Sequence, residues 1–245
     1  MTSFGVVARV RRVLSEQKRA AHNAEPTTCP NFRSGVCRCK VKIGHTGTLD
    51  PFATGLMILV VGKETKNAAT YSKLDKVYEA TIVLGQTSST GDPEGEISEL
   101  GSERVRELKS STITEVLPQF VGEIQQTPPV YSAIKIGGQR AYKLARKGEA
   151  VEMPTRTISI YSLEFVSYTY PELRIRTHVS SGTYIRTLAE DIGRALGVGA
   201  YCKELRRTQI AQWHVEDAEP LQAWLERNDD GDDRPKDDHE QNRRG

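Results

Sequence analysis

Apolar residues recur at helical spacing near the start of the chain, with arginines between them. The cap-forming residues Thr2 and Ser3 precede this pattern, so we predict a basic amphipathic helix over residues 2–14. The apolar positions that carry the pattern are Val7, Val10 and Leu14. Residues 18–40 then lose all periodicity and collect proline, glycine, asparagine and threonine, which predicts an irregular loop.

Strand-like and helix-like patterns follow one another along the rest of the chain without a regular βαβ order. We predict strands at 56–61, 78–84, 157–166 and 173–179, and helices at 64–74, 102–120 and 185–196. The last helix has the clearest pattern, because its apolar residues share one face and Gly197 stands where a C-terminal cap is expected. These elements predict an α+β fold with a mixed, mostly antiparallel sheet flanked by helices.

Two polar segments interrupt this pattern. Residues 126–152 have two prolines near one end and a series of basic residues after them, so we predict a projecting basic insertion. The basic residues of this series are Lys135, Arg140, Lys143, Arg146 and Lys147. Residues 218–245 predict a short helix followed by an acidic, disordered tail, because almost no apolar residues follow Leu225.

The composition is that of a globular protein with one large domain or two small ones. The 245 residues are 37% hydrophobic and 27% charged, and the mean hydropathy is −0.50. The longest apolar run, 56–61, is far shorter than the roughly 18 residues of a membrane span, so we expect no membrane association. Arginines from Arg9 onward interrupt any signal-peptide core, and we therefore expect a cytoplasmic protein.

The net charge of +2 is unevenly distributed along the chain. Residues 216–245 contain eleven acidic and five basic residues, so the preceding 215 residues carry an excess of eight positive charges. A basic body is typical of a protein that binds a polyanion such as nucleic acid, although a solvated charged surface has the same composition.

A turn-rich sequence, GHTGTLDPFATG, leads directly into the predicted strand at 56–61. Its Pro51 keeps Asp50 out of helical geometry, and a loop that feeds a core strand can present one carboxylate rigidly. From the spacing alone, a simple turn residue explains Asp50 equally well.

Five sequence blocks together change this interpretation. In order over residues 42–210, they resemble the motifs of the TruB family of tRNA pseudouridine synthases. The blocks are GHTGTLDPFATGLMILVVGKETK, KVYEA through LGQT with Asp92, QTPPVYSAIK, SGTYIRTL and LRRT. The resemblance implies the pseudouridine synthase fold and an enzyme that needs no cofactor and no catalytic metal.

The resemblance implies a reaction in which the N-glycosidic bond of uridine breaks, the uracil turns while still held, and a bond to C5 forms. By similarity Asp50 is the catalytic carboxylate, which acts as a nucleophile on the sugar or base, or as the base that removes a ribose proton. The matching arginine, Arg186, would pair with Asp50 and favour its ionised form.

Further residues are assigned to the substrate by the same resemblance. Tyr78 would stack on the extruded uracil close to C5, and Tyr184 would pack on the nucleotide from another side. The backbone of Leu205 would touch the base, and His45 would help to hold the flipped nucleotide. Lys66 would contact a phosphate or help to arrange the aspartate. Taken singly, each of these residue types is more often structural.

The implied substrate is the folded T-arm of tRNA, with uridine 55 as the target. A stacked uridine must be flipped out at a cost of about a few kcal/mol, which basic and aromatic contacts must offset. The basic insertion 126–152 corresponds to the RNA-gripping thumb of the family, and residues 1–217 to its catalytic domain. We expect the protein to act as a monomer.

The chain departs from the family pattern at both ends. It opens without the strand and Lys-Pro-x-Gly stretch that family members usually carry. The loop at 18–40 is much longer than the usual link to the GHTG motif. Residues 218–245 are too few for the RNA-binding PUA domain that many relatives append, so we expect no such domain.

The loop at 18–40 contains three of the four cysteines. Cys29, Cys37 and Cys39, with His22 nearby, have the residue types of a zinc site, but the spacing C-x7-C-x-C matches no common zinc finger. We therefore expect reduced thiols in an irregular loop and do not expect zinc. Four cysteines in a chain of this length do not make a disulfide framework.

Three other functions remain open at this point. One is an RNA-binding or tRNA-folding protein without catalysis, although intact Asp50, Tyr78 and Arg186 argue against it. Another is a zinc-dependent nucleic-acid binder built on the cysteine cluster. The third is a synthase that acts on a different RNA, because sequence indicates chemistry more securely than substrate.

Overall fold

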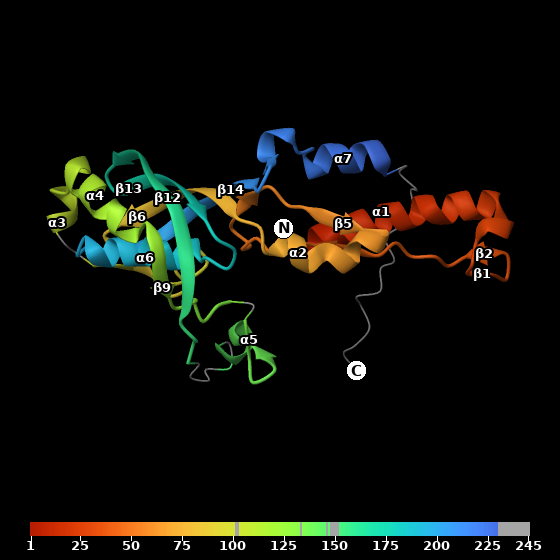
Figure 1. Ribbon diagram of the computed structural model, residues 1–245, viewed down its shortest axis with the longest axis horizontal. Helices are drawn as coiled ribbons and strands as arrows, with labels where there is room; N and C mark the ends of the chain where they lie inside the picture. Colours follow the sequence, from red (N-terminus) through yellow and green to blue (C-terminus); the bar gives the residue numbers. More distant parts are fainter. Residues whose placement is uncertain (101–102, 133, 146, 148–151, 230–245) are drawn as a thin grey trace, which may run out of the picture.

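A mostly antiparallel sheet forms the body of the structure, which is a computed structural model describing residues 1–100, 103–132, 134–145, 147 and 152–229. The strand order is β15-β14-β6-β13-β12-β9, and β4 pairs with β14 in parallel (Figure 1). The strands are β4 (Thr54–Gly55), β6 (Lys76–Leu84), β9 (Gly122–Gln126), β12 (Arg156–Thr169), β13 (Glu172–Val179), β14 (Ala200–Ile210) and β15 (Trp213–His214). This topology confirms the predicted α+β class and the mixed, mostly antiparallel sheet.

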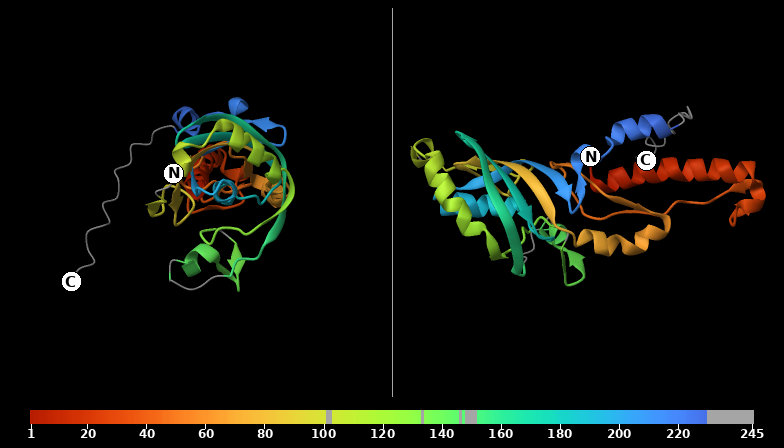
Figure 2. Two further views of the ribbon diagram at one scale, coloured as in Figure 1. Left: turned by 90° about the vertical axis from the view of Figure 1, so that its left-hand side faces the viewer. Right: turned by 45° about the horizontal axis from the view of Figure 1, so that its top comes forward.

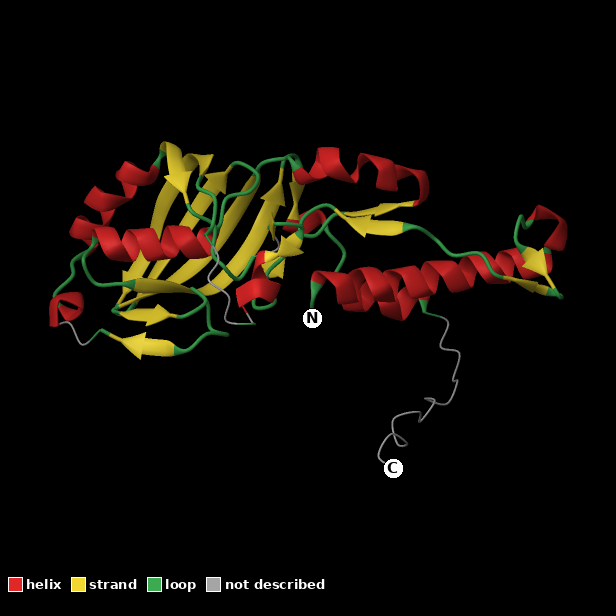
Figure 3. Ribbon diagram, turned by 90° about the horizontal axis from the view of Figure 1, so that it is seen from below, coloured by secondary structure: helices red, strands yellow, loops and turns green. Residues whose placement is uncertain are grey.

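The helix α6 (Ile185–Ala195) packs across the sheet and closes the main core (Figure 3). Its predicted apolar face is buried, and Gly197 ends it with a φ of +71°, as expected of a helix-capping glycine. The sheet side of this core comes from alternating residues of the central strands, such as Ile82 and Ile175. The core therefore holds α6 against the inner strands β14 and β6.

A second, smaller apolar cluster joins the N-terminal helix to a hairpin. The helix α1 (Ser3–Ala24) packs its buried Val7 and Val10 against β3 (Ile43–His45), which pairs with β5 (Leu59–Val61). The helix α7 (Leu221–Asn228) lies alongside and adds Trp224 to the cluster. The predicted cap at Thr2 forms, since its hydroxyl accepts a hydrogen bond of 3.1 Å from Gly5 N.

The N-terminal helix is longer than predicted. It continues past residue 14 to Ala24, so residues 18–24, predicted as part of an irregular loop, are helical. These residues are good helix formers, and a helix that extends beyond the body needs no apolar face there. The rest of the segment contains η1 (Pro26–Thr28) and a small hairpin of β1 (Phe32–Arg33) and β2 (Val36–Cys37), at the far end of α1 (Figures 1 and 3).

Other predicted elements are present but divided. Only the last three residues of the apolar run at 56–61 form a strand, β5, which pairs with β3, and β4 ends just before the run begins. The helix predicted at 64–74 is η2 (Gly62–Asn67) followed by α2 (Ala68–Ser72). The helix predicted at 102–120 is split into α3 (Glu103–Arg106), α4 (Ser110–Val116) and η3 (Leu117–Phe120). Strand β14 was not predicted from periodicity.

The basic insertion at 126–152 leaves the sheet after β9 and projects from the body (Figure 2). Its described residues form β10 (Lys135–Ile136), β11 (Gln139–Arg140) and α5 (Ala141–Ala145). Arg146 of the basic series lies outside the described residues, as does the predicted tail beyond residue 229.

Short elements complete the chain. They are the hairpin of β7 (Gln86–Ser88) and β8 (Ile97–Glu99), and the turn η4 (Val215–Asp217) before α7. Within the described ranges, no helix is both long and apolar enough to cross a membrane.

Candidate active site

Asp50 lies on the loop between β3 and β4, and both sides of this loop are anchored. The hydroxyl of Ser3 at the start of α1 accepts a hydrogen bond from Leu49 N (2.9 Å) and donates one to Leu49 O (3.3 Å). After the aspartate, Ala53 N donates to Asp50 O at 2.9 Å and closes a turn. The GHTGTLDP sequence therefore presents its carboxylate from a fixed loop, as predicted.

The far end of this loop joins the sheet at a glycine. Gly55 has a φ of +101°, and a Cβ atom at this position would lie 2.2 Å from the carbonyl oxygen of Arg207. The next residue, Leu56, donates its backbone N–H to the same oxygen at 2.8 Å. Because only glycine tolerates both the backbone angle and the close approach, Gly55 sets how closely the loop lies to β14.

Arg186, the second residue of α6, pairs with Asp50. Its Nε donates to Asp50 Oδ2 at 2.9 Å, and the arginine side chain is only 4% exposed. The other guanidinium nitrogens donate to Thr90 O (2.9 Å) and Tyr131 O (3.0 Å) and lie 3.1 Å from a carboxylate oxygen of Asp92. With its donors directed by four groups, Arg186 holds the Asp50 carboxylate in one orientation.

The Asp50 carboxyl is partly buried yet still accessible, with 32% of its side chain exposed. Burial raises its pKa, and the nearby Asp92 adds to this effect. The charge and hydrogen bond of Arg186 act in the opposite direction and favour the ionised form. Asp50 is therefore a carboxylate whose basicity is raised by its surroundings and whose direction is fixed by an arginine.

Tyr78 stands on the central strand β6, directly opposite Arg207 of β14. Arg207 is 1% exposed, and its side chain donates to Gly47 O (3.3 Å) of the loop that carries Asp50 and to Leu56 O (2.8 Å) just after β4. Burial raises the pKa of the Tyr78 hydroxyl, the Arg207 guanidinium lowers it, and the charge of Asp50 raises it again. The tyrosine hydroxyl, the aspartate and this second arginine therefore share one electrostatic environment.

Tyr184 caps the N-terminus of α6, two residues before Arg186. The buried side chain of Gln126 clamps its backbone, because it accepts from Tyr184 N (2.8 Å) and donates to Tyr184 O (3.0 Å). Burial raises the pKa of the Tyr184 hydroxyl, and Asp50 is among the charges that act on it. Gln126 thus fixes the backbone of Tyr184 at the start of α6.

Three other predicted site residues take different positions. His45 ends β3, its Nδ1 is buried without a hydrogen-bond partner, and burial next to the charge of Arg207 lowers its pKa. Leu205 is buried on β14 opposite Ala80 of β6, two register pairs from Tyr78. Lys66 is exposed in η2, and within the described residues it has no hydrogen bond or ion pair with the aspartate.

Sequence reasoning gave no role to three residues that hold the site together. All three belong to the sequence blocks that resemble the family, and Gln126 also begins the basic insertion. The sequence around Arg207 could have indicated a buried charge, because Arg207 follows the apolar Leu205 by two residues and so lies on the same, buried face of a strand. For Asp92 and Gln126 the partners are distant in sequence, and nothing local marks them.

The site combines an accessible carboxylate, two tyrosines on whose hydroxyls its charge acts, and two buried guanidinium groups. Among the described residues, the one cluster of potential metal ligands consists of His22, Cys29, Cys37 and Cys39, near the other end of α1. The aspartate site itself thus offers acid–base and nucleophilic groups and stacking surfaces.

Two family models match the chain in succession. Residues 35–185 match the model described as TruB family pseudouridylate synthase (N terminal domain). Residues 186–235 match the model described as tRNA pseudouridylate synthase B C-terminal domain. The first match includes the aspartate loop and Tyr78, and the second begins at Arg186.

Similar proteins of known name agree with these matches. The chain is 43% identical over 202 residues to tRNA pseudouridine synthase B of Phocaeicola vulgatus, covering 80% of this chain and 85% of that protein. It is 46% identical over 192 residues to the protein of the same name from Parabacteroides distasonis, with coverage of 77% and 81%. The corresponding protein of Aquifex aeolicus is 45% identical over 186 residues, with coverage of 75% and 64%.

Solved structures share the fold. The crystal structure of a Cbf5-Nop10-Gar1 complex contains a chain with a TM-score of 0.58 and 28% identity, covering 87% of this chain and 46% of that one. A chain in the structure of an H/ACA RNP bound to a substrate RNA containing 2'-deoxyuridine has a TM-score of 0.59 and 23% identity, with coverage of 94% and 52%. The chain described here spans about half the length of these solved chains.

Proposed function

Because the chain belongs to the TruB family of pseudouridylate synthases, we propose that it isomerises uridine 55 in the T-arm of tRNA to pseudouridine. The relatives that resemble it over most of their length are named tRNA pseudouridine synthase B, which supports tRNA as the substrate. A tRNA substrate also fits the cytoplasmic location and the monomeric state expected from the sequence.

One observation carries the proposal. Asp50 is partly exposed on an anchored loop, and its carboxylate is paired at 2.9 Å with the buried Arg186. A carboxylate that lost water without gaining such a partner would become protonated and would be a poor nucleophile. The arginine therefore keeps Asp50 ionised in a site that an RNA base would seal from solvent.

In the proposed reaction, Asp50 acts first, either as the nucleophile on the nucleotide or as the base that removes a ribose proton. The N-glycosidic bond breaks, the uracil turns within the site, and C5 bonds to C1' of the ribose. C5 then loses its proton and N1, freed from the ribose, gains one, while any bond formed to Asp50 breaks. The reaction is an isomerisation, so atoms and charge balance without any added reactant.

The neighbouring residues hold the detached base. We assign the ring of Tyr78 to stacking on the uracil close to C5, and that of Tyr184 to packing on the nucleotide from another side. The backbone of Leu205 lies two register pairs from Tyr78, on the neighbouring strand, a position that supports contact with the base edge. His45 helps to hold the flipped nucleotide, and we assign the exposed Lys66 to a phosphate contact rather than to Asp50.

The proposed reaction assigns separate roles to two parts of the chain. We propose residues 1–217 as the catalytic domain and the projecting insertion 126–152 as the thumb that grips RNA. The thumb leaves the body directly after Gln126, which clamps Tyr184, so RNA held by the thumb would lie next to the site. Structured RNA is recognised by shape, by backbone contacts and by splayed bases, and a basic projection supplies the first two.

The test is incubation of the purified protein with an unmodified tRNA transcript, without added metal or nucleotide, followed by mapping of pseudouridine at single-base resolution. We expect one product, at position 55. A matched transcript with cytidine at that position should give none. The Asp50→Asn variant is the protein control, and it should bind the transcript without modifying it.

The other outcomes separate the rival functions. Pseudouridine at a different position, or only in another RNA, would keep the chemistry and overturn the substrate. Tight binding of tRNA with no pseudouridine in any RNA would favour an RNA-binding protein without catalysis. Pseudouridine made by the Asp50→Asn variant would overturn the catalytic assignment.

A further inference from the structure

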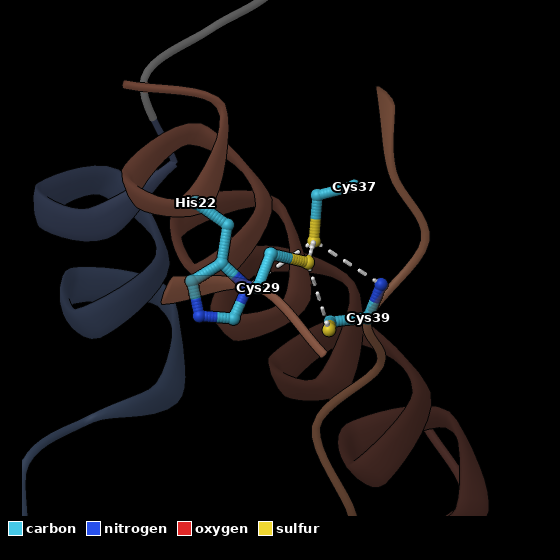
Figure 4. A group of neighbouring side chains, drawn as sticks. All are labelled: His22, Cys29, Cys37 and Cys39. Atoms are coloured by element: carbon cyan, nitrogen blue, oxygen red, sulfur yellow. Dashed lines mark hydrogen bonds between the residues drawn. The ribbon is translucent and has the colours of Figure 1, made fainter. Parts of the chain in front are cut away.

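The structure gathers four potential metal ligands at the far end of α1, outside the aspartate site. From this geometry we propose that His22, Cys29, Cys37 and Cys39 bind one structural zinc ion (Figure 4). The sequence spacing matches no common finger, and the helical course of residues 18–24 is what brings His22 into the group.

The ligand atoms lie at distances that suit a tetrahedral site. All four lie within 4.8 Å of one another. His22 Nδ1 is 3.2 Å from Cys37 Sγ, and Cys29 Sγ is 3.1 Å from Cys37 Sγ and 3.7 Å from Cys39 Sγ. Zinc–sulfur bonds of about 2.3 Å in a tetrahedron place two sulfurs about 3.8 Å apart. Small shifts of these side chains would therefore complete the coordination.

The same distances argue against a disulfide. A disulfide requires two sulfurs about 2.05 Å apart, and all of these cysteines are free thiols in the structure. A bond between any two of them would also leave the third thiol and the histidine unused. A Cys3His set instead occupies all four positions of a tetrahedral zinc, which is typical of structural rather than catalytic sites.

The segment has no apolar core that would explain why its thiols are buried. Cys37 and Cys39 are 1% and 4% exposed, yet Val36 beside them is 51% exposed. Neither apolar cluster of the described residues includes a residue between 15 and 40. Small structural units without a core usually need a metal or disulfides to stay folded. A bound zinc ion would supply the cross-link for the β1–β2 hairpin.

Backbone and side-chain groups around the cysteines hold them in place and favour their thiolate form. The backbone N–H of Cys39 points to Cys37 Sγ at 3.4 Å, and Cys37 N donates to Asn23 Oδ1 of the helix at 2.9 Å. Such outer contacts orient ligands and stabilise their charge. Three thiolates and a neutral imidazole around Zn²⁺ leave one negative charge, which the adjacent Arg38 and Lys40 would offset.

The proposed zinc would tie the last turn of α1 to the strand that returns toward the aspartate loop. The first turn of the same helix holds that loop through Ser3 and Leu49, so α1 spans both sites. We therefore assign the ion a structural role: it fixes the course of residues 22–39. This inference does not depend on the proposed function.

The test measures metal in the full-length protein, purified with a thiol reductant and without a metal-affinity tag. We expect one zinc per chain by mass spectrometry of the metal, and tetrahedral sulfur–nitrogen coordination by X-ray absorption. Cobalt exchanged into the site should show the visible bands of a tetrahedral thiolate complex. The variants Cys37→Ser and His22→Ala should lose the metal, whereas Cys202→Ala, which removes the buried cysteine of the main core, should keep it.

A second readout does not rely on variants that fold. Zinc should protect Cys29, Cys37 and Cys39 of the wild-type protein from alkylation, and a chelator should expose all three and lower the melting temperature. Three alkylatable thiols with no zinc, under purification that retains metals, would overturn the proposal. So would a disulfide among them, or iron in place of zinc.

Discussion

The Nε atom of Arg186 lies 2.9 Å from Oδ2 of Asp50, although 136 residues separate the two in the sequence. The sheet, the aspartate loop and the start of α6 must all form before this contact exists. Catalysis by the proposed mechanism therefore depends on the whole fold.

Replacing Asp50 by asparagine should separate activity from stability. We expect pseudouridine formation to fall by about 10⁴-fold or more, because no other described carboxylate lies in the same position relative to the tyrosines. Burial raises the pKa of Asp50, so its ionised form is disfavoured in the folded state and a neutral amide removes that cost. Turnover of tRNA and the melting temperature, measured side by side, test this. A large drop in melting temperature would contradict it.

Replacing Arg186 by glutamine should lower both activity and stability. The change leaves the buried Asp92 without its cation and the carbonyl groups of Thr90 and Tyr131 without a donor. Breaking a buried ion pair on one side costs about 3–5 kcal/mol, which urea denaturation would measure.

The matched control adds Asp92→Asn to the same chain. The double variant should regain part of the free energy of unfolding, because no uncompensated charge remains, but it should stay inactive. If the double variant were no more stable than the single one, the ion pair with Asp92 would not be the source of the loss.

The rate should depend on the protonation of Asp50. Burial raises its pKa from the ordinary value, so kcat/KM should fall with decreasing pH at a higher pH than a solvent-exposed aspartate would give. The charge of Asp92 contributes to the rise, so the Asp92→Asn variant should move the acidic limb to lower pH. An unchanged limb in that variant would show that another group controls it.

The raised pKa of Asp50 affects stability and activity in opposite directions as the pH changes. A carboxyl whose pKa is raised on folding binds a proton more tightly in the native state than in the unfolded state. Its contribution to stability is therefore present at pH values below the unfolded pKa and is lost as the pH rises through the raised pKa. Comparing the pH dependence of unfolding between wild type and Asp50→Asn isolates this contribution.

Tyr78 should contribute through both its ring and its hydroxyl. The Tyr78→Phe variant keeps the stacking surface, so we expect tRNA affinity to remain while turnover falls by about 10²-fold or more. The Tyr78→Leu variant loses the flat ring and should also impair capture of the flipped base. Single-turnover rates and filter binding distinguish the two effects. Full activity of the phenylalanine variant would show that the Tyr78 hydroxyl has no role in the reaction.

Gly55 should be more sensitive to substitution than a glycine of similar backbone angle elsewhere. Alanine at Gly55 would clash with the carbonyl of Arg207, so we expect a loss of about 3 kcal/mol or more and a displaced aspartate loop. Gly122 has a similar φ, +111°, but open space around it, so Gly122→Ala should cost only about 1–2 kcal/mol. Equal losses at both positions would mean that the close approach is unimportant.

Local patterns predicted the elements whose burial is regular. Helix α6 was found because its apolar residues repeat on one face, and β6 and β13 because apolar residues occupy every second position along them. The patterns failed where tertiary contacts decide the outcome. Only the end of the apolar run at 56–61 is a strand, because β5 pairs with β3 whereas Leu56 bonds to the backbone of β14. The helix α1 continues through residues that have no apolar face.

The site shows a similar division. The resemblance to a family named the pair of Asp50 and Arg186, which no periodicity could connect. It did not assign roles to Arg207 and Gln126, whose partners are mainly backbone atoms of distant segments. Such contacts depend on the path of the main chain, and that path becomes visible only when the strands are placed.

The Arg186 guanidinium connects the projecting insertion to Asp50. Arg186 donates to the carbonyl of Tyr131, at the root of the projecting insertion, with one nitrogen and to Asp50 with another. If cognate RNA moved the insertion toward the body, the guanidinium of Arg186 would shift with Tyr131 and change the position of the Asp50 carboxylate. An RNA that fits the insertion poorly would then leave the nucleophile misaligned, and fidelity would be enforced at the chemical step as well as at binding.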